Sequence, residues 1–332
     1  MNKWAVEETL LNVMDWKTNG AKLLCGQNSY EVFSSPYSLG CSTTGELVSI
    51  STLDELENEE ISGKILLLHG EIAREQIMPK YFVFYNPEKH QRVISILEKS
   101  GVKAIICATG HNPALAGGVY PFPMFEDGDF NIPSVYMKDT EGEKLIDDRE
   151  KTVFLESKSI RTPETAYNII GRKSGISKKR IVITAHIDAK KGTPGAIDNA
   201  TGVTVLLLLS ELLKEYATKY SIEMVAFNGE DYYAASGQMK YIEQNENCFS
   251  DILLNINIDG AGYKTGKSSF SLFDLPDDIK SAVQKIIRNN SALKEGAPWY
   301  QGDHSIFLQN GCPSIAASSS WFIENMDTQD IT

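Results

Sequence analysis

The chain has 332 residues, of which 42% are apolar, so it is long enough for one large domain and a smaller one. Its 44 acidic and 32 basic residues give a net charge of −12, which disfavours binding to nucleic acid or to anionic membranes. No apolar run approaches the roughly 20 residues of a membrane span, and the acidic start is unlike a secretory signal. The five cysteines are scattered without CxxC spacing, which indicates neither a disulfide framework nor a thiolate zinc site. We therefore expect a cytoplasmic protein that binds neither nucleic acid nor membranes.

The pattern of apolar and polar residues along the chain changes near residue 45 and again near residue 160. It opens with a helical pattern over residues 6–16 and then becomes irregular. Residues 46–158 show a separate succession of strand-like and helix-like segments. They are predicted to form a small α/β domain inserted into the rest of the chain. The elements predicted within this insert are strands at 64–70, 103–107, 132–138 and 151–157, and helices at 87–101 and from Thr140.

From residue 159 onward, short apolar strands alternate with helical segments. The predicted strands lie at 167–171, 181–185, 222–227, 252–258 and 314–318, and the predicted helices at about 200–216, from 232, at 277–290 and after His304. This alternation favours an α/β fold with a mixed, largely parallel sheet covered by helices on both faces. The main domain would combine residues 1–45 with residues 159–332. In such sheets, ligands bind beyond the carboxyl ends of the strands.

Side chains of the metal-ligand type follow these strands at that edge. They are His186 and Asp188 after the first strand, Asp198 in a glycine-flanked turn, Glu230 and Asp231 after the second strand, Asp259 after the third, and His304 at the last helix. Each has a commoner explanation by itself, as a surface turn, a helix cap or a solvated helix start. Together they predict a carboxylate-rich site for Zn²⁺ or another divalent ion. Three acids and two imidazoles exceed the needs of one tetrahedral ion, so we expect two ions that share a bridging carboxylate.

Two further roles follow from such a site. Glu230 would be free of metal and is predicted to act as the general base on a water molecule. Asp188 is predicted to accept the second N–H of His186 and so to fix its tautomer. Trp299 and Tyr300 are candidates for lining a pocket for an apolar side chain, although aromatic residues beside a site more often serve packing.

As an ordered set, these motifs resemble the co-catalytic zinc aminopeptidases of the bacterial leucyl aminopeptidase and aminopeptidase Y type. That family also contains glutamate carboxypeptidases and glutaminyl cyclases. The resemblance covers about residues 160–320. It is carried by His186-x-Asp188, Gly195-Ala196-Ile197-Asp198-Asn199 with Gly202, Glu230-Asp231, Asp259, and Asp303-His304 followed by Gly311-x-Pro313.

The resemblance implies a role for each matching residue. Asp198 would bridge two zinc ions, with His186 and Asp259 completing one site and Asp231 and His304 the other. Glu230 would take the position of the catalytic base. The insert, residues 46–158, resembles the protease-associated domains found in these enzymes, and self-association into a homo-oligomer through it is left open.

Two departures from the family pattern stand out. Many members have Glu-Glu where this chain has Glu230-Asp231, so the shorter side chain must reach its zinc with one methylene less. The chain also stops at Thr332, before the family's usual His-Thr loop and closing helix, and we expect a packing helix and part of the site wall to be missing.

The implied activity is hydrolysis of the first peptide bond of peptides with a free N-terminus. Two enzymes on the same scaffold, a carboxypeptidase and a glutaminyl cyclase, stay open as alternatives, as does a non-catalytic binding protein.

Overall fold

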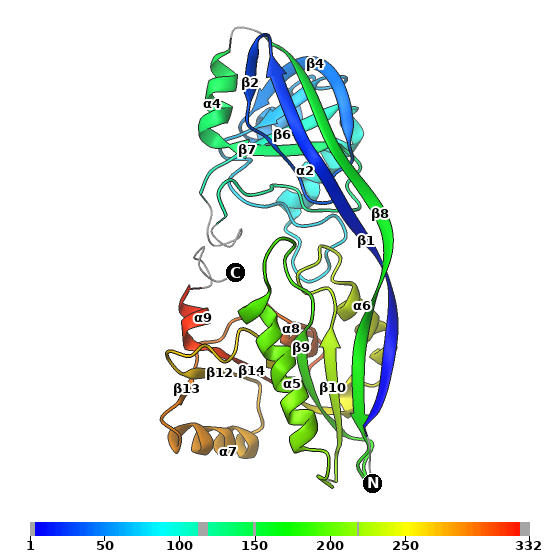
Figure 1. The fold of residues 1–332 in the computed structure, drawn as a ribbon, viewed down its shortest axis with the longest axis vertical. Helices are drawn as coiled ribbons and strands as arrows, with labels where there is room; N and C mark the ends of the chain where they lie inside the picture. Colours follow the sequence, from blue (N-terminus) through cyan, green and yellow to red (C-terminus); the bar gives the residue numbers. More distant parts are fainter. Residues whose placement is uncertain (1–3, 112–118, 149–150, 218, 326–332) are drawn as a thin grey trace. The chain divides into compact units, whose positions relative to one another are not determined.

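The computed structural model describes residues 4–111, 119–148, 151–217 and 219–325 and is drawn in Figure 1. The chain forms two compact units. Within the described residues, the main unit comprises the chain up to residue 12 and from residue 165 onward, and the insert unit comprises residues 13–164. Strands β1 (Ala5–Cys25) and β8 (Thr152–Lys173) each contribute residues to both units.

The main unit is built on a sheet with the strand order β13-β12-β14-β11-β9-β10-β8. Its strands are β9 (Arg180–His186), β10 (Ser221–Phe227), β11 (Ile252–Ile258), β12 (Ser268–Phe273), β13 (Leu293–Glu295), β14 (Ser314–Ser319) and the last part of β8. The four central strands, β14, β11, β9 and β10, are parallel to one another. They read as nearly continuous apolar runs because a central parallel strand is buried on both faces. Strands β8 and β12 flank them in the antiparallel direction.

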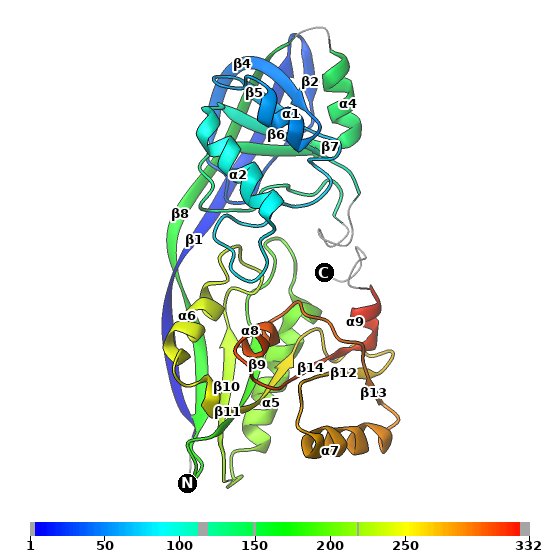
Figure 2. The ribbon, with the colours of Figure 1, turned by 180° about the vertical axis from the view of Figure 1, so that it is seen from behind.

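Helices cover both faces of this sheet. Helix α5 lies in front of the strands in Figure 1 and behind them in Figure 2, whereas α6 and α8 lie on the opposite side. The helices of the main unit are α5 (Thr201–Leu212), α6 (Ser236–Asn245), α7 (Asp277–Arg288), α8 (His304–Gln309) and α9 (Ser320–Asn325), together with the short turns η1 (Ala196–Ala200) and η2 (Phe249–Asp251). The predicted α/β class, with its largely parallel sheet between helices, is confirmed.

The strands of the insert unit continue the same strand path beyond β8. The strand order of this unit is β8-β4-β5-β6-β7-β3, and the three inner pairings, from β4 to β7, are parallel. Its elements are β2 (Asn28–Tyr30), β3 (Phe33–Ser34), β4 (Cys41–Ile50), α1 (Leu53–Asn58), β5 (Ile65–Leu68), α2 (Glu88–Ser100), β6 (Ala104–Thr109), β7 (Ser134–Lys138) and α4 (Asp139–Asp147). Two clusters of buried apolar side chains give this unit its own core. Its assignment to the protease-associated type stays a prediction.

Three expectations about local structure were wrong. Residues 6–16 form part of strand β1 and no helix, because β1 pairs with β8 and buries Thr9 and Leu11 in the alternating pattern of a strand. The two strands predicted at 151–157 and 167–171 are parts of the single strand β8. Strand β12 was missed because serines alternate with its apolar residues, yet its Ser269 and Ser271 are buried.

The borders of the units also differ from the predicted borders at residues 45/46 and 158/159. Residues 13–45 belong to the insert unit, because β3 pairs with β7 and β4 pairs with β5. No helix among the described residues is long and apolar enough to cross a membrane.

Candidate metal centre

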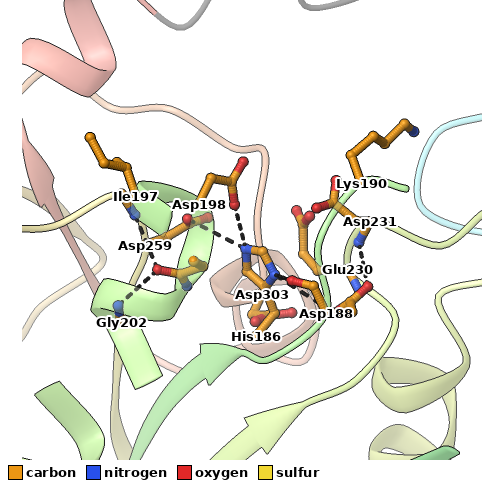
Figure 3. Close-up of polar contacts among 12 residues, drawn as sticks. His186, Asp188, Lys190, Ile197, Asp198, Gly202, Glu230, Asp231, Asp259 and Asp303 are labelled. Atoms are coloured by element: carbon orange, nitrogen blue, oxygen red, sulfur yellow. Dashed lines mark hydrogen bonds and ion pairs between the residues drawn. The ribbon is translucent and has the colours of Figure 1, made fainter. Parts of the chain in front are cut away.

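Three neighbouring parallel strands end side by side at the candidate site. His186, the last residue of β9, pairs in register with Phe227, the last residue of β10, and Thr184 of β9 pairs with Asn257 of β11. The segments that follow β9, β10 and β11 therefore leave the same edge of the sheet. Figure 3 shows the polar side chains of these segments gathered around His186.

His186, Asp198 and Asp259 form one group of potential ligands. Nε2 of His186 lies 2.9 Å from Oδ1 of Asp198 and 3.5 Å from Oδ1 of Asp259. All three atoms are buried, and apart from one another they have no polar partner among the described residues. Buried polar atoms are normally paired, so three of them converging on one point fit a cation that is bound between them. One imidazole and two carboxylates are also a common protein ligand set for zinc.

The turn that carries Asp198 is fixed by its neighbour Asn199, to which it is joined by a cis peptide bond. The buried Asn199 amide donates to the carbonyl oxygen of Ile258 at 2.9 Å. Its Oδ1 accepts the backbone N–H of Gly202 at 3.0 Å and that of Gly260 at 3.3 Å. One side chain therefore ties the turn before α5 to the end of β11, which places Asp198 opposite Asp259.

Asp188 organises the loop after β10. Its carboxylate accepts the backbone N–H of Glu230 at 3.2 Å and that of Asp231 at 3.0 Å. Nδ1 of His186 lies 3.1 Å from the carbonyl oxygen of Asp188 and 3.6 Å from its carboxylate. Because a carbonyl oxygen only accepts, Nδ1 carries the proton and Nε2 keeps its lone pair for a metal ion. Asp188 thus fixes the tautomer mainly through its backbone, where a carboxylate contact was expected.

His186, Glu230 and Asp231 form a second group, whose potential ligand atoms lie within 4.8 Å of one another. Burial and the charges of Asp259 and Asp231 raise the pKa of Glu230 well above its usual value, while His186 opposes this shift. Burial, followed by the charge of Asp198, raises the pKa of Asp231 to about 7.

The protonation state of the His186 imidazole depends on the same cluster of neighbouring acids. Burial by itself would lower its pKa, but the acids at positions 188, 198 and 259 outweigh burial and raise it. In the absence of a metal ion, the imidazole therefore holds a proton that an incoming cation has to displace.

His304, the predicted ligand from the last helix, belongs to neither group. Its ring is fully buried, and Nε2 donates to the carbonyl oxygen of Trp299 at 2.8 Å. The ring packs against Trp299 and Phe273, with ring centroids 4.8 and 5.1 Å away. Its Nδ1 is buried, has no hydrogen-bond partner among the described residues and keeps a lone pair, but it joins no group of three potential ligands, so His304 as a ligand stays a prediction. Trp299 is buried in this packing, and Tyr300 is 66% exposed.

Sequence reasoning assigned no role to Asp303, which lies beside the cluster (Figure 3). Its buried carboxylate accepts a hydrogen bond from Nε2 of Gln238 at 2.7 Å. Burial raises the pKa of Asp303 to about 7, although His186 and Gln238 pull it down. Asp303 and His304 are adjacent residues of the ligand type, so the sequence offered no means of choosing between them.

The fold, with its cluster of potential metal ligands at the carboxyl edge of the sheet, matches that of solved zinc aminopeptidase structures. Residues 168–330, slightly less than half of the chain, match the model of Peptidase family M28.

Two curated relatives also match the chain. Aminopeptidase YwaD of Bacillus subtilis (strain 168) is 27% identical over 230 residues, which are 65% of this chain and 48% of that protein. Leucine aminopeptidase 1 of Emericella nidulans is 25% identical over 178 residues, 46% of this chain and 45% of that protein. The chain thus spans about half the length of the curated relatives it matches.

Solved structures share the fold. An aminopeptidase from Aneurinibacillus sp. strain AM-1 superposes with a TM-score of 0.72 at 19% identity, over 96% of this chain and 76% of that one. A zinc aminopeptidase from Bacillus subtilis superposes with a TM-score of 0.68 at 23% identity, over 95% of this chain and 75% of that one.

Proposed function

We propose that this chain is a zinc-dependent exopeptidase that hydrolyses the first peptide bond of peptides with a free N-terminus. The observation that carries the proposal is the convergence at the edge of the sheet of three buried ligand atoms, from His186, Asp198 and Asp259, that have only one another as partners among the described residues. The named activities of the relatives, an aminopeptidase and a leucine aminopeptidase, supply the reaction class.

The three ligands would hold the ion through Nε2 of His186 and the carboxylates of Asp198 and Asp259. A bound zinc ion supplies Lewis acidity and lowers the pKa of water toward neutrality. Asp188 keeps the imidazole of His186 in the tautomer that binds metal. Its carboxylate also anchors the backbone of Glu230 and Asp231, so the loop after β10 faces the same point.

Glu230 fits the role of general base. It lies beside the ligands, and its raised pKa brings the carboxyl closer to neutral pH, where a group can both take up and return a proton. In the proposed reaction, Glu230 takes a proton from the attacking water and returns it to the leaving amine. The acidic surroundings also suit a substrate with a protonated α-amino group, which confines cleavage to the first residue.

The test is hydrolysis of a panel of aminoacyl p-nitroanilides by the zinc-loaded chain, beside the same compounds with acetylated amines. We expect cleavage of the free-amine compounds only. Glu230→Gln should keep its zinc and lose about 10²- to 10⁴-fold in kcat, whereas Glu246→Gln, an exposed control on the same unit, should behave like the parent. Cleavage of acetylated peptides with a free C-terminal carboxylate, without cleavage of the free-amine anilides, would favour a carboxypeptidase, and full activity of Glu230→Gln would remove its role.

A further inference from the structure

His186 is shared by both groups of potential ligands. One group joins it to Asp198 and Asp259, and the other joins it to Glu230 and Asp231. Among the described residues, no three His, Cys, Asp or Glu side chains come within the same 4.8 Å without His186. The number of ions that these residues can hold therefore depends on how many ions the imidazole of His186 can bind at once.

The imidazole of His186 can serve only one ion. Nδ1 faces the carbonyl oxygen of Asp188 at 3.1 Å and is committed as a donor, so Nε2 is the only nitrogen with a free lone pair. That nitrogen lies 2.9 Å from Asp198 and 3.5 Å from Asp259. It is buried together with one oxygen of each acid, and these atoms have only one another as partners among the described residues, which places its ion in the first group.

Among the residues that the structure describes, the other side of the cluster then has too few ligands for an ion of its own. Without His186, the second group retains only Glu230 and Asp231, and Glu230 is needed as the base. Catalytic zinc sites ordinarily have three protein ligands. His304 does not complete the set, because it belongs to no group of three potential ligands among the described residues. Lys190 lies next to Asp231 in Figure 3. The ammonium group of Lys190 thus brings a positive charge to the Asp231 side of the cluster.

We propose that this chain binds a single zinc ion, through His186, Asp198 and Asp259, and that Asp231 holds no ion of its own. The inference deepens the proposed function and rests on its metal centre. It departs from the pair of zinc ions expected from the sequence.

The test is a metal count on the full 332-residue chain. The protein is stripped with a chelator, dialysed against buffered zinc, and analysed by inductively coupled plasma mass spectrometry. Cobalt titration followed by visible absorption gives a second, independent stoichiometry. We expect one ion per chain by both methods, with the cobalt signal saturating at one equivalent.

Two matched variants locate the ion, since each replaces one aspartate by the amide of the same shape. Asp259→Asn should lose the ion at zinc concentrations that saturate the parent, whereas Asp231→Asn should retain one ion per chain. Asp198→Asn serves as the second ligand variant if Asp259→Asn does not fold, as judged by circular dichroism.

The possible outcomes separate this inference from the proposed function. Two ions per chain, with one lost in Asp231→Asn, would overturn the single-ion inference and leave the exopeptidase proposal standing. One ion per chain without hydrolysis of any panel substrate would support the inference and contradict the proposed activity. No bound ion would overturn both.

Discussion

The carboxylate of Asp188, just beyond the end of β9, accepts the backbone N–H of Glu230, just beyond the end of β10, at 3.2 Å. This contact links the loop that orients the imidazole of His186 to the loop that carries the proposed base. The two loops are far apart along the chain but are held as one piece of the metal centre. The backbone N–H of Asp231, the residue after Glu230, donates to the other oxygen of the Asp188 carboxylate at 3.0 Å. Both oxygens of Asp188 therefore accept a hydrogen bond.

Asp188→Asn should weaken zinc binding without removing a ligand. The amide group presents N–H where an acceptor is needed, so one of the two backbone donors loses its partner and the loops shift. Loss of such an outer contact typically costs about 10- to 100-fold in metal affinity, which competition with a fluorescent chelator would measure. Asp278→Asn, on the exposed first turn of α7, is the matched control. Equal zinc affinities for the two variants would refute the positioning role of Asp188.

Asn199→Ala should destabilise the main unit. The substitution leaves the N–H groups of Gly202 and Gly260 and the carbonyl oxygen of Ile258 without their buried partner. Each such loss costs about 1–3 kcal/mol, so we expect the free energy of unfolding to fall by about 3 kcal/mol in urea denaturation. Asn12→Ala, exposed on β1, should change it by less than about 0.5 kcal/mol. An Asn199→Ala protein as stable as the control would show that the turn does not depend on this side chain.

Glu223→Gln tests a buried ion-pair network on β10. The Glu223 side chain is 3% exposed and accepts hydrogen bonds from Nε of Arg172 and from the hydroxyl of Tyr241, both at 2.6 Å. Neutralising it removes the charge that faces the guanidinium groups of Arg172 and Arg180, and because Arg172 is 40% exposed the cost should lie below the roughly 3–5 kcal/mol of a fully buried pair. Thermal denaturation should therefore show a marked decrease in stability.

Glu7→Gln provides the control for that experiment because Glu7 binds the same guanidinium, at 2.6 Å, from a position that is 51% exposed. Exposed pairs contribute less than about 1 kcal/mol. The two variants should thus differ by several degrees in Tm, and similar values for both would mean that burial does not strengthen the Glu223 pair.

Much of the main unit was predictable because its strands are buried on both faces. β9, β10 and β11 appear in the sequence as apolar runs that end at His186, before Glu230 and before Asp259, so the parallel-sheet rule placed these residues at one edge. The segment over residues 6–16 offered no such signal. Its pattern fits a helix, and only pairing with β8, more than a hundred residues away, makes it a strand.

By itself, the sequence determined which residue types leave the carboxyl edge of the sheet, since strand ends follow from local apolar patterns. The tertiary structure decided which atoms meet. It brought His186, Asp198 and Asp259 together, turned the imidazole of His304 toward the carbonyl oxygen of Trp299, and gave Asp188 two backbone donors to hold. Side-chain direction depends on rotamers and on long-range hydrogen bonds such as those of Asn199, and these exist only once distant segments have packed.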